Sequence, residues 1–134
     1  MQTIIPAVGY EDAPAAIEWL KRAFGFTERL VVPGENGTIA HAELQLLENL
    51  IMLGTTRPEI FGMSSPRRLN GTTMSFYIIV PDPDAMHDRA FEAGATIVRA
   101  LNNTEYGSRE FICRDPEGHL WCFGTYDPMA PVAG

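Results

Sequence analysis

The chain has 134 residues, of which 46% are hydrophobic and 20% are charged, and its formal net charge at pH 7 is −7. This length allows one compact domain or two small modules that share a core. The ten basic residues are spread along the chain and form no cluster larger than a pair, which argues against a nucleic acid or an anionic membrane as partner.

Targeting signals do not stand out in the sequence. There is no apolar run of about 18 residues and no signal-peptide pattern at the start, so we expect a cytoplasmic protein. Cys113 and Cys122 fit no zinc-binding or CxxC spacing and are expected to be free thiols.

The first half of the chain predicts one helix among four strands. Segment 3–16 reads as an apolar strand, a short acidic turn and the start of a helix. Apolar residues then recur at helical spacing up to Gly25, and Asp12 suits the N-terminal cap of that helix. Strand-like runs follow near 28–33, 38–46 and 50–54, which gives the order βαβββ.

The same order returns about 70 residues later. Segment 73–86 matches the pattern of 3–16, and "HLWCFGT" at 119–125 repeats "NLIMLGT" at 49–55. A second helix is predicted from Asp82 to Gly94, followed by strands near 96–101, 108–113 and 119–124. The fold class is therefore α+β, with two tandem βαβββ modules, 1–56 and 72–128, in a single domain, 1–134. The connector 57–71 is long enough to be a lid or a crossover.

Alternation along the first predicted hairpin separates a polar face from an apolar one. A turn at Glu48-Asn49 places Gln45 opposite Met52 and Glu43 opposite Gly54. The polar face then carries His41, Glu43, Gln45 and Met52, while the apolar face, expected to meet the helix, carries Ala42, Leu44, Leu46, Ile51 and Leu53.

The second predicted hairpin turns at Pro116-Glu117, which places Phe111 opposite Cys122. The face away from the helix is then predicted to carry Arg109, Phe111, Cys113, Leu120, Cys122 and Gly124. The helix side is predicted to carry Ile112, Trp121 and Phe123.

The double βαβββ pattern resembles the vicinal oxygen chelate superfamily, also called the glyoxalase, bleomycin resistance and extradiol dioxygenase superfamily. The most specific local similarity is "YGSREFICRDPEGHLWCFGTYDP" at 106–128, where a "DPEGH" turn precedes an apolar strand. The resemblance covers nearly the whole chain. It implies half-barrel sheets with helices on the convex side, a ligand in the concave cup, and a homodimer with two cups.

Many members of this superfamily hold a divalent metal with residues from the first and last strands of each half. The corresponding positions here are Ile5, Met52, Ser75 and Cys122, and none of them is His, Glu, Gln or Asp. The resemblance is therefore to the metal-free, bleomycin-resistance-like branch, and no cofactor is expected. A divalent metal near His41 and Glu43, which share one strand face, is the alternative.

The resemblance implies a set of ligand-binding residues in the cup. The apolar ones are Ile5, Ala7, Met52, Tyr77, Phe111, Leu120 and Cys122, and the polar ones are His41, Glu43, Gln45, Ser75 and Arg109. Tyr106 either reaches the mouth of the cup or lies on the surface.

Three functions stay open at this stage. The first is binding of a small aromatic or amphipathic molecule, such as an antibiotic, without chemistry. The second is a lyase, isomerase or dioxygenase that uses a divalent metal or a His41/Glu43 acid–base pair. The third is an interaction module without a ligand.

Overall fold

A computed structural model describes residues 2–131, and both halves of the chain have the predicted βαβββ order. The first module comprises β1 (Ala7–Tyr10), α1 (Ala13–Phe24), β2 (Thr27–Pro33), a 3-10 turn (Glu35–Gly37), β3 (Ile39–Leu46) and β4 (Asn49–Thr55). The connector contains α2 (Pro58–Phe61) and α3 (Pro66–Leu69). The second module comprises β5 (Ser75–Ile79), α4 (Pro83–Glu92), β6 (Thr96–Asn103), β7 (Arg109–Arg114) and β8 (Leu120–Gly124). None of the helices in the described residues has the length and apolar character needed to cross a membrane.

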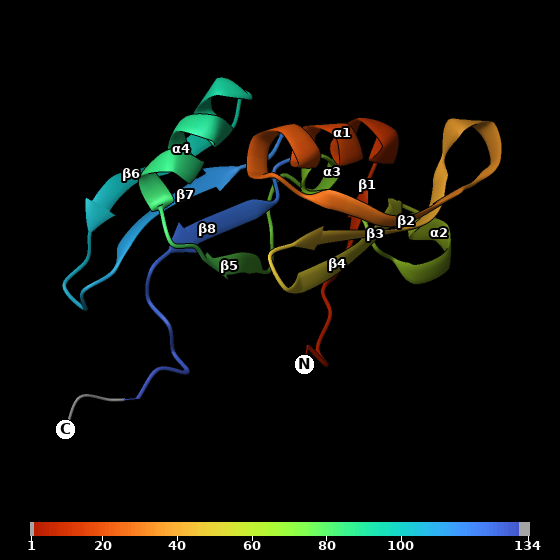
Figure 1. The fold of residues 1–134 in the computed structure, drawn as a ribbon. Helices are drawn as coiled ribbons and strands as arrows, with labels where there is room; N and C mark the ends of the chain where they lie inside the picture. The colour runs from red at the N-terminus through yellow and green to blue at the C-terminus, as the bar shows by residue number, and fades with distance from the viewer. Residues whose placement is uncertain (1, 132–134) are drawn as a thin grey trace.

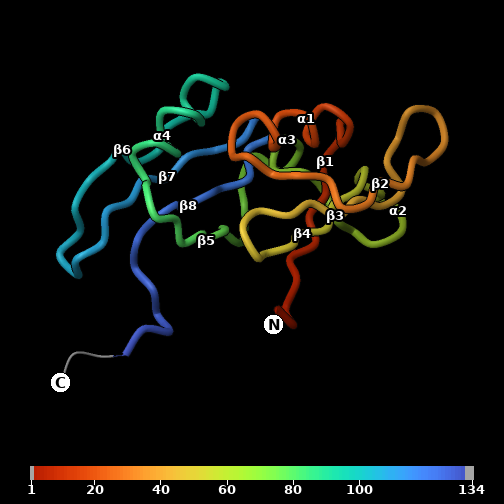
Figure 2. Tube along the Cα trace, in the orientation of Figure 1, coloured from red at the N-terminus to blue at the C-terminus, as the bar shows by residue number. Residues whose placement is uncertain are grey.

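Each module forms its own four-stranded mixed sheet. The strand orders are β1-β4-β3-β2 and β5-β8-β7-β6, with β1 parallel to β4 and β5 parallel to β8. Figure 1 shows the two sheets next to each other, with α1 and α4 along the same side of both. Figure 2 shows that the two chain ends leave from the opposite side, where these helices do not cover the sheets. We call this uncovered side the open face.

Both long helices begin as the sequence predicts. The Asp12 carboxylate accepts a hydrogen bond from the Ala15 amide at 3.2 Å, and the Asp82 carboxylate accepts one from the Ala85 amide at 3.1 Å. Each bond satisfies an amide that has no partner within its own helix. Gly25 ends α1 in the left-handed conformation, with φ of 87°.

Aromatic side chains between helices and sheets form a core that spans both modules. The ring centre of Phe24, at the end of α1, lies 5.0 Å from that of Trp121 and 4.8 Å from that of Phe123, both on β8. The indole N–H of Trp19 donates to the carbonyl of Ala93 at 2.7 Å, which joins α1 to the end of α4. The predicted helix-side positions of Trp121 and Phe123 are confirmed, because both are buried, and Trp19 is buried as well.

The first hairpin has the predicted faces in a different register. Its turn is Leu47-Glu48, so that Glu43 pairs with Met52 and Gln45 with Leu50. The register differs from the prediction by two residues, and a shift of two leaves every side chain on its face. The predicted apolar face is buried, and the polar face is only partly covered.

The second hairpin differs from the prediction by one residue, which reverses the faces of β7. Its turn spans residues 115–119, with a hydrogen bond from the Asp115 amide to the His119 carbonyl. Phe111 consequently pairs with Phe123, and Cys113 with Trp121. The predicted positions of Phe111 and Cys113 on the open face are wrong, because both are fully buried and Phe111 packs against His87 of α4. The open face of β7 carries Glu110, Ile112 and Arg114 instead.

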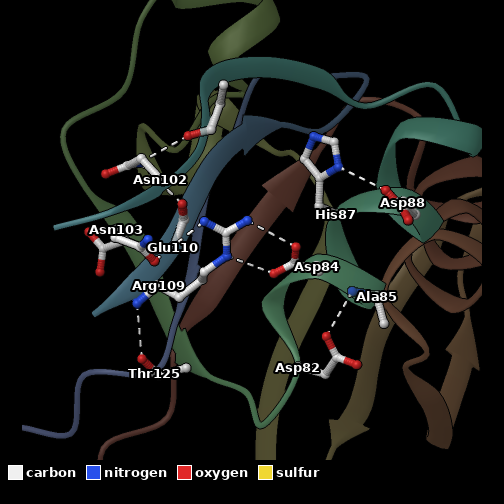
Figure 3. A network of polar contacts seen from close by, with 11 residues as sticks. Asp82, Asp84, Ala85, His87, Asp88, Asn102, Asn103, Arg109, Glu110 and Thr125 are labelled. Carbon is white, nitrogen blue, oxygen red and sulfur yellow. Dashed lines mark hydrogen bonds and ion pairs between the residues drawn. The ribbon is translucent and has the colours of Figure 1, made fainter. Parts of the chain in front are cut away.

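Arg109 is also wrongly predicted to lie on the open face. Its guanidinium lies against the Asp84 carboxylate in the first turn of α4, with Nε to Oδ1 at 2.8 Å and Nη2 to Oδ2 at 3.0 Å (Figure 3). Hydrogen bonding to this guanidinium lowers the pKa of Asp84. Arg109 therefore ties β7 to α4 on the helix side of the sheet.

The Asp115 carboxylate joins the two modules from inside the "DPEGH" turn. Its Oδ1 accepts the backbone amides of 117–119 at 3.0–3.1 Å, which holds the five-residue turn. Its Oδ2 accepts the Tyr10 hydroxyl at 2.6 Å and the Trp121 indole N–H at 3.0 Å. Burial and the neighbouring Asp115 charge raise the pKa of Tyr10 far above its ordinary value, which keeps the hydroxyl a donor.

The Glu117 carboxylate makes a second junction in the same turn. Its oxygens accept the amides of Glu11 and Asp12 at 2.7 and 2.8 Å, where α1 begins. They also accept the Ser65 hydroxyl of the connector at 2.6 Å. Both modules and the connector therefore meet at this buried carboxylate.

Candidate functional site

The structure distributes the predicted ligand residues over two pockets that share no residue. The pocket on the first sheet includes Ala7, His41 and Met52, and the pocket on the second sheet includes Ser75, Tyr77 and Cys122. The other predicted residues line neither pocket: Ile5, Glu43, Gln45, Leu120, Arg109 and Phe111. Within one chain, the predicted set therefore does not surround one ligand.

The pocket on the first sheet is small, with a volume of about 200 Å³. Phe61 and Met63 of the connector form one side of it. His41 and Glu43 are in contact, as their spacing predicts, with His41 Nε2 at 2.9 Å from Glu43 Oε2. Both side chains are partly exposed, and the pair is a candidate acid–base arrangement on this face.

The pocket on the second sheet is larger, at about 650 Å³. Its floor is the open face of β5, β7 and β8, and its rim includes Tyr106, Tyr126 and Pro128. The rings of Tyr106 and Tyr126 lie edge to face, with centres 5.5 Å apart and planes at 77°. A concave site of this size with a mostly apolar and aromatic lining suits a small molecule. Tyr106 is expected either at the mouth of the cup or on the surface. It lies at the rim of this pocket, with its side chain largely exposed.

A buried carboxylate lies in the wall of this second pocket. Glu110 accepts the Tyr106 hydroxyl at 2.6 Å and the Ser108 hydroxyl at 2.8 Å. Tyr77 on β5, which also lines the pocket, donates a hydrogen bond from its hydroxyl to the carbonyl of Tyr126 at 2.8 Å. The pocket thus has three tyrosine rings and one carboxylate held in place by hydrogen bonds.

Gly124 makes room for this arrangement. A Cβ at this position would lie 2.7 Å from the Tyr77 hydroxyl and 2.9 Å from Glu110 Oε2. Both groups therefore converge on the space that a larger residue would fill.

Sequence analysis misses four residues of this pocket: Glu110, Ile112, Tyr126 and Pro128. Glu110 and Ile112 are missed because the predicted register of β7 turns them to the helix side. Tyr126 lies beyond the last strand, where strand alternation gives no direction. If all five residues of "DPEGH" are assigned to the turn, with the Asp115 side chain accepting its backbone amides, Glu110 and Ile112 are placed correctly.

Cys122 is in this pocket as a protonated thiol. Burial raises the pKa of Cys122 to about 11, and the Glu110 charge contributes in the same direction. At pH 8, only about one thiol in 1,000 is then in the reactive thiolate form. We expect iodoacetamide to alkylate native Cys122 about 100-fold more slowly than the same residue in urea at pH 8.

Mass spectrometry of the peptide that contains Cys122 measures this rate. Cys113 provides an internal comparison, because burial raises its pKa to about 12 and its side chain is fully covered. Equal rates for native and denatured Cys122 would contradict the expected protection.

The side chains available for a metal do not form a suitable ligand set. Within residues 2–131, no group of three or more His, Cys, Asp or Glu side chains is placed to hold an ion. At the four positions that resemble metal ligands, Ile5 and Met52 offer no donor for a hard cation, and Ser75 and Cys122 offer a hydroxyl and a protonated thiol. The donor chemistry therefore does not fit the metal that many members of the superfamily hold.

Residues 6–123 match the Glyoxalase/Bleomycin resistance protein/Dioxygenase superfamily. An uncharacterized protein of Mycobacterium bovis is 37% identical over 121 residues, which are 89% of this chain and 80% of that protein. An uncharacterized protein of Mycobacterium tuberculosis H37Rv shows the same identity over 71% of its own length.

Solved structures show the same fold. TioX from Micromonospora sp. ML1 is 33% identical, with a TM-score of 0.72 over 92% of this chain and 98% of TioX. A glyoxalase-related enzyme from Fulvimarina pelagi has a TM-score of 0.73 over 99% of this chain and 93% of its own. That enzyme is 18% identical to this chain, so the similarity concerns the fold alone.

Proposed function

Because the chain belongs to the Glyoxalase/Bleomycin resistance protein/Dioxygenase superfamily, we propose that it binds a small aromatic or amphipathic molecule without a metal. The observation that carries this proposal is the pocket on the second sheet, where apolar side chains and three tyrosines surround about 650 Å³. Sequestration of an antibiotic is one biological use of such binding.

The two sheets present different open faces. On the second sheet, Ile112 and Cys122 form an apolar floor for a ring system, and the tyrosines form its sides. On the first sheet, the open face is largely apolar at β2, where Leu30 and Val32 are exposed beside Glu43 and His41.

We include a homodimer in the proposal, because a second copy would cover these apolar open faces and bring two half-barrels together. We also place the protein in the cytoplasm, where Cys113 and Cys122 would remain reduced. Light scattering of the protein at micromolar concentration tests the dimer, and a monomer mass would remove it from the proposal.

Nile red, a neutral aromatic dye that fluoresces in apolar sites, tests the proposed binding. Metal-stripped protein is expected to bind it saturably, and Ile112→Gln is expected to weaken binding at least about fivefold, because a polar amide replaces apolar contact. The matched control is Val98→Gln on β6, an exposed apolar residue outside the pocket. Equal affinity of both variants for Nile red, or no binding of Nile red by the wild-type protein, would contradict the proposal.

The contact between His41 and Glu43 supports a second candidate function, an enzyme of this superfamily with an acid–base pair or a metal on the first sheet. Thermal unfolding with Ni²⁺, Zn²⁺, Mn²⁺, Fe²⁺, Co²⁺ and Mg²⁺ in turn separates the two candidates. An ion at a hundredfold its dissociation constant adds about 2.7 kcal/mol to stability. A rise in Tm that Glu43→Gln abolishes would favour the enzyme over the metal-free binder.

A further inference from the structure

The Glu110 carboxylate is buried without a cation. The residue is only 3% exposed, and its two carboxylate oxygens are held by the hydroxyls of Tyr106 and Ser108. Across residues 2–131, no Lys, Arg or His nitrogen lies within ion-pair distance of it. Two neutral donors offset only part of the cost of burying a carboxylate, so a cation in the pocket would be strongly favoured there.

Arginines on the same sheet have other positions. Arg114 donates to the carbonyl of Gly118 at 2.8 Å, at the end of β7 far from Glu110 along the strand. Arg99, on β6 opposite Ile112, does not line the pocket and forms no ion pair with Glu110, although its charge reaches Cys122 and offsets part of the rise in the pKa of that thiol. Arg109 pairs with Asp84 on the other face. Within residues 2–131, the pocket therefore contains a carboxylate that no guanidinium group pairs with.

The aromatic rim favours a cation as well. Tyr77, Tyr106 and Tyr126 line the same pocket as Glu110, and the faces of aromatic rings attract ammonium groups electrostatically. The hydrogen bond to Glu110 raises the pKa of Tyr106, so its hydroxyl stays neutral and does not add a second negative charge. A net charge of −7 for the chain adds a favourable long-range field.

We propose that the pocket on the second sheet selects a cationic ligand, a protonated or quaternary amine joined to an aromatic or apolar body. The nitrogen lies beside the Glu110 carboxylate and among the tyrosine rings, and the apolar body lies on Ile112 and Cys122. This inference rests on the proposed function, because it names the chemical class of molecule that the same pocket takes.

Two probes of equal shape isolate the charge. The cation is 3-hydroxyphenyltrimethylammonium, and its neutral counterpart is 3-tert-butylphenol, in which carbon replaces the nitrogen. Each is titrated into ¹⁵N-labelled protein and followed by NMR at pH 7, with the shifts mapped onto β5, β7 and β8. The wild-type protein is expected to bind the cation at least about tenfold more tightly than the neutral probe.

Two variants complete the experiment. Glu110→Gln keeps the size of the side chain and removes its charge, and it is expected to abolish the tenfold preference while neutral binding changes less than about threefold. Glu92→Gln on α4 makes the same change at an exposed carboxylate outside the pocket, so it is the matched control and is expected to retain the preference.

Equal binding of the two probes by the wild-type protein would overturn the inference, and so would a preference that survives Glu110→Gln. In both cases neutral binding would leave the proposed function intact. If neither probe nor Nile red binds, the proposed function fails and the inference fails with it. If Glu110→Gln loses its dispersed NMR spectrum, the comparison of the two probes on the wild-type protein decides.

Discussion

Replacement of Asp115 by alanine is expected to lower the free energy of unfolding by about 3–5 kcal/mol. The carboxylate accepts five hydrogen bonds, three from backbone amides of the turn and one each from Tyr10 and Trp121. Alanine would leave these buried donors without a partner, and each such donor costs about 1–3 kcal/mol when it is not satisfied. The total falls below the sum, because water and local relaxation satisfy the donors nearest the surface.

Urea unfolding of Asp115→Ala and Asp127→Ala measures the effect with a matched control. Asp127 is exposed and accepts one backbone amide, from Met129 at 2.8 Å. Its replacement is expected to cost less than about 1 kcal/mol. A similar loss of stability in the two variants would show that the Asp115 bonds do not hold the modules together.

Replacement of Phe24 by alanine is expected to cost about 3–5 kcal/mol, within the range for large buried aromatic side chains. Phe24 packs against four aromatic rings, of which Trp121 and Phe123 belong to the other module. A cavity at this position would therefore loosen the contact between modules, and neighbouring side chains can fill it only in part.

Phe91 provides the control for that variant, because it also lies near the end of its helix. Phe91 lies in the last turn of α4 and is 63% exposed, so it contributes little to the core. Phe91→Ala is expected to change stability by less than about 1 kcal/mol. Calorimetry of both variants tests the difference, and a loss for Phe24→Ala below about 1 kcal/mol would contradict the packing described for it.

The fold could be predicted from sequence because the same pattern occurs twice. Strand and helix periods, the capping residues Asp12 and Asp82 and the terminal Gly25 each agree with the structure. The faces of the first hairpin were also predictable, since alternating apolar residues fix the face of a strand even when its register is uncertain.

The candidate site was less predictable, because it depends on one turn. The "DPEGH" segment reads as a two-residue turn if only proline and glycine are considered. In the structure the Asp115 side chain accepts hydrogen bonds from three backbone amides. Residues 115 and 119 are hydrogen-bonded, so the loop between them has one residue more than predicted, and the pairing of β7 with β8 shifts by one. This one residue moves Glu110 and Ile112 to the open face and Phe111 and Cys113 into the core.

The bonds from Glu117 to the beginning of α1 bear on how the chain folds. A carboxylate at the amino end of a helix stabilises that helix, and here it comes from a turn about 100 positions further along the chain. The first repeat therefore lacks one of its own helix-stabilising groups until the last hairpin has formed. The two halves have similar sequences, but they form one cooperative folding unit. Most of the chain must therefore be synthesised before either half reaches its full stability.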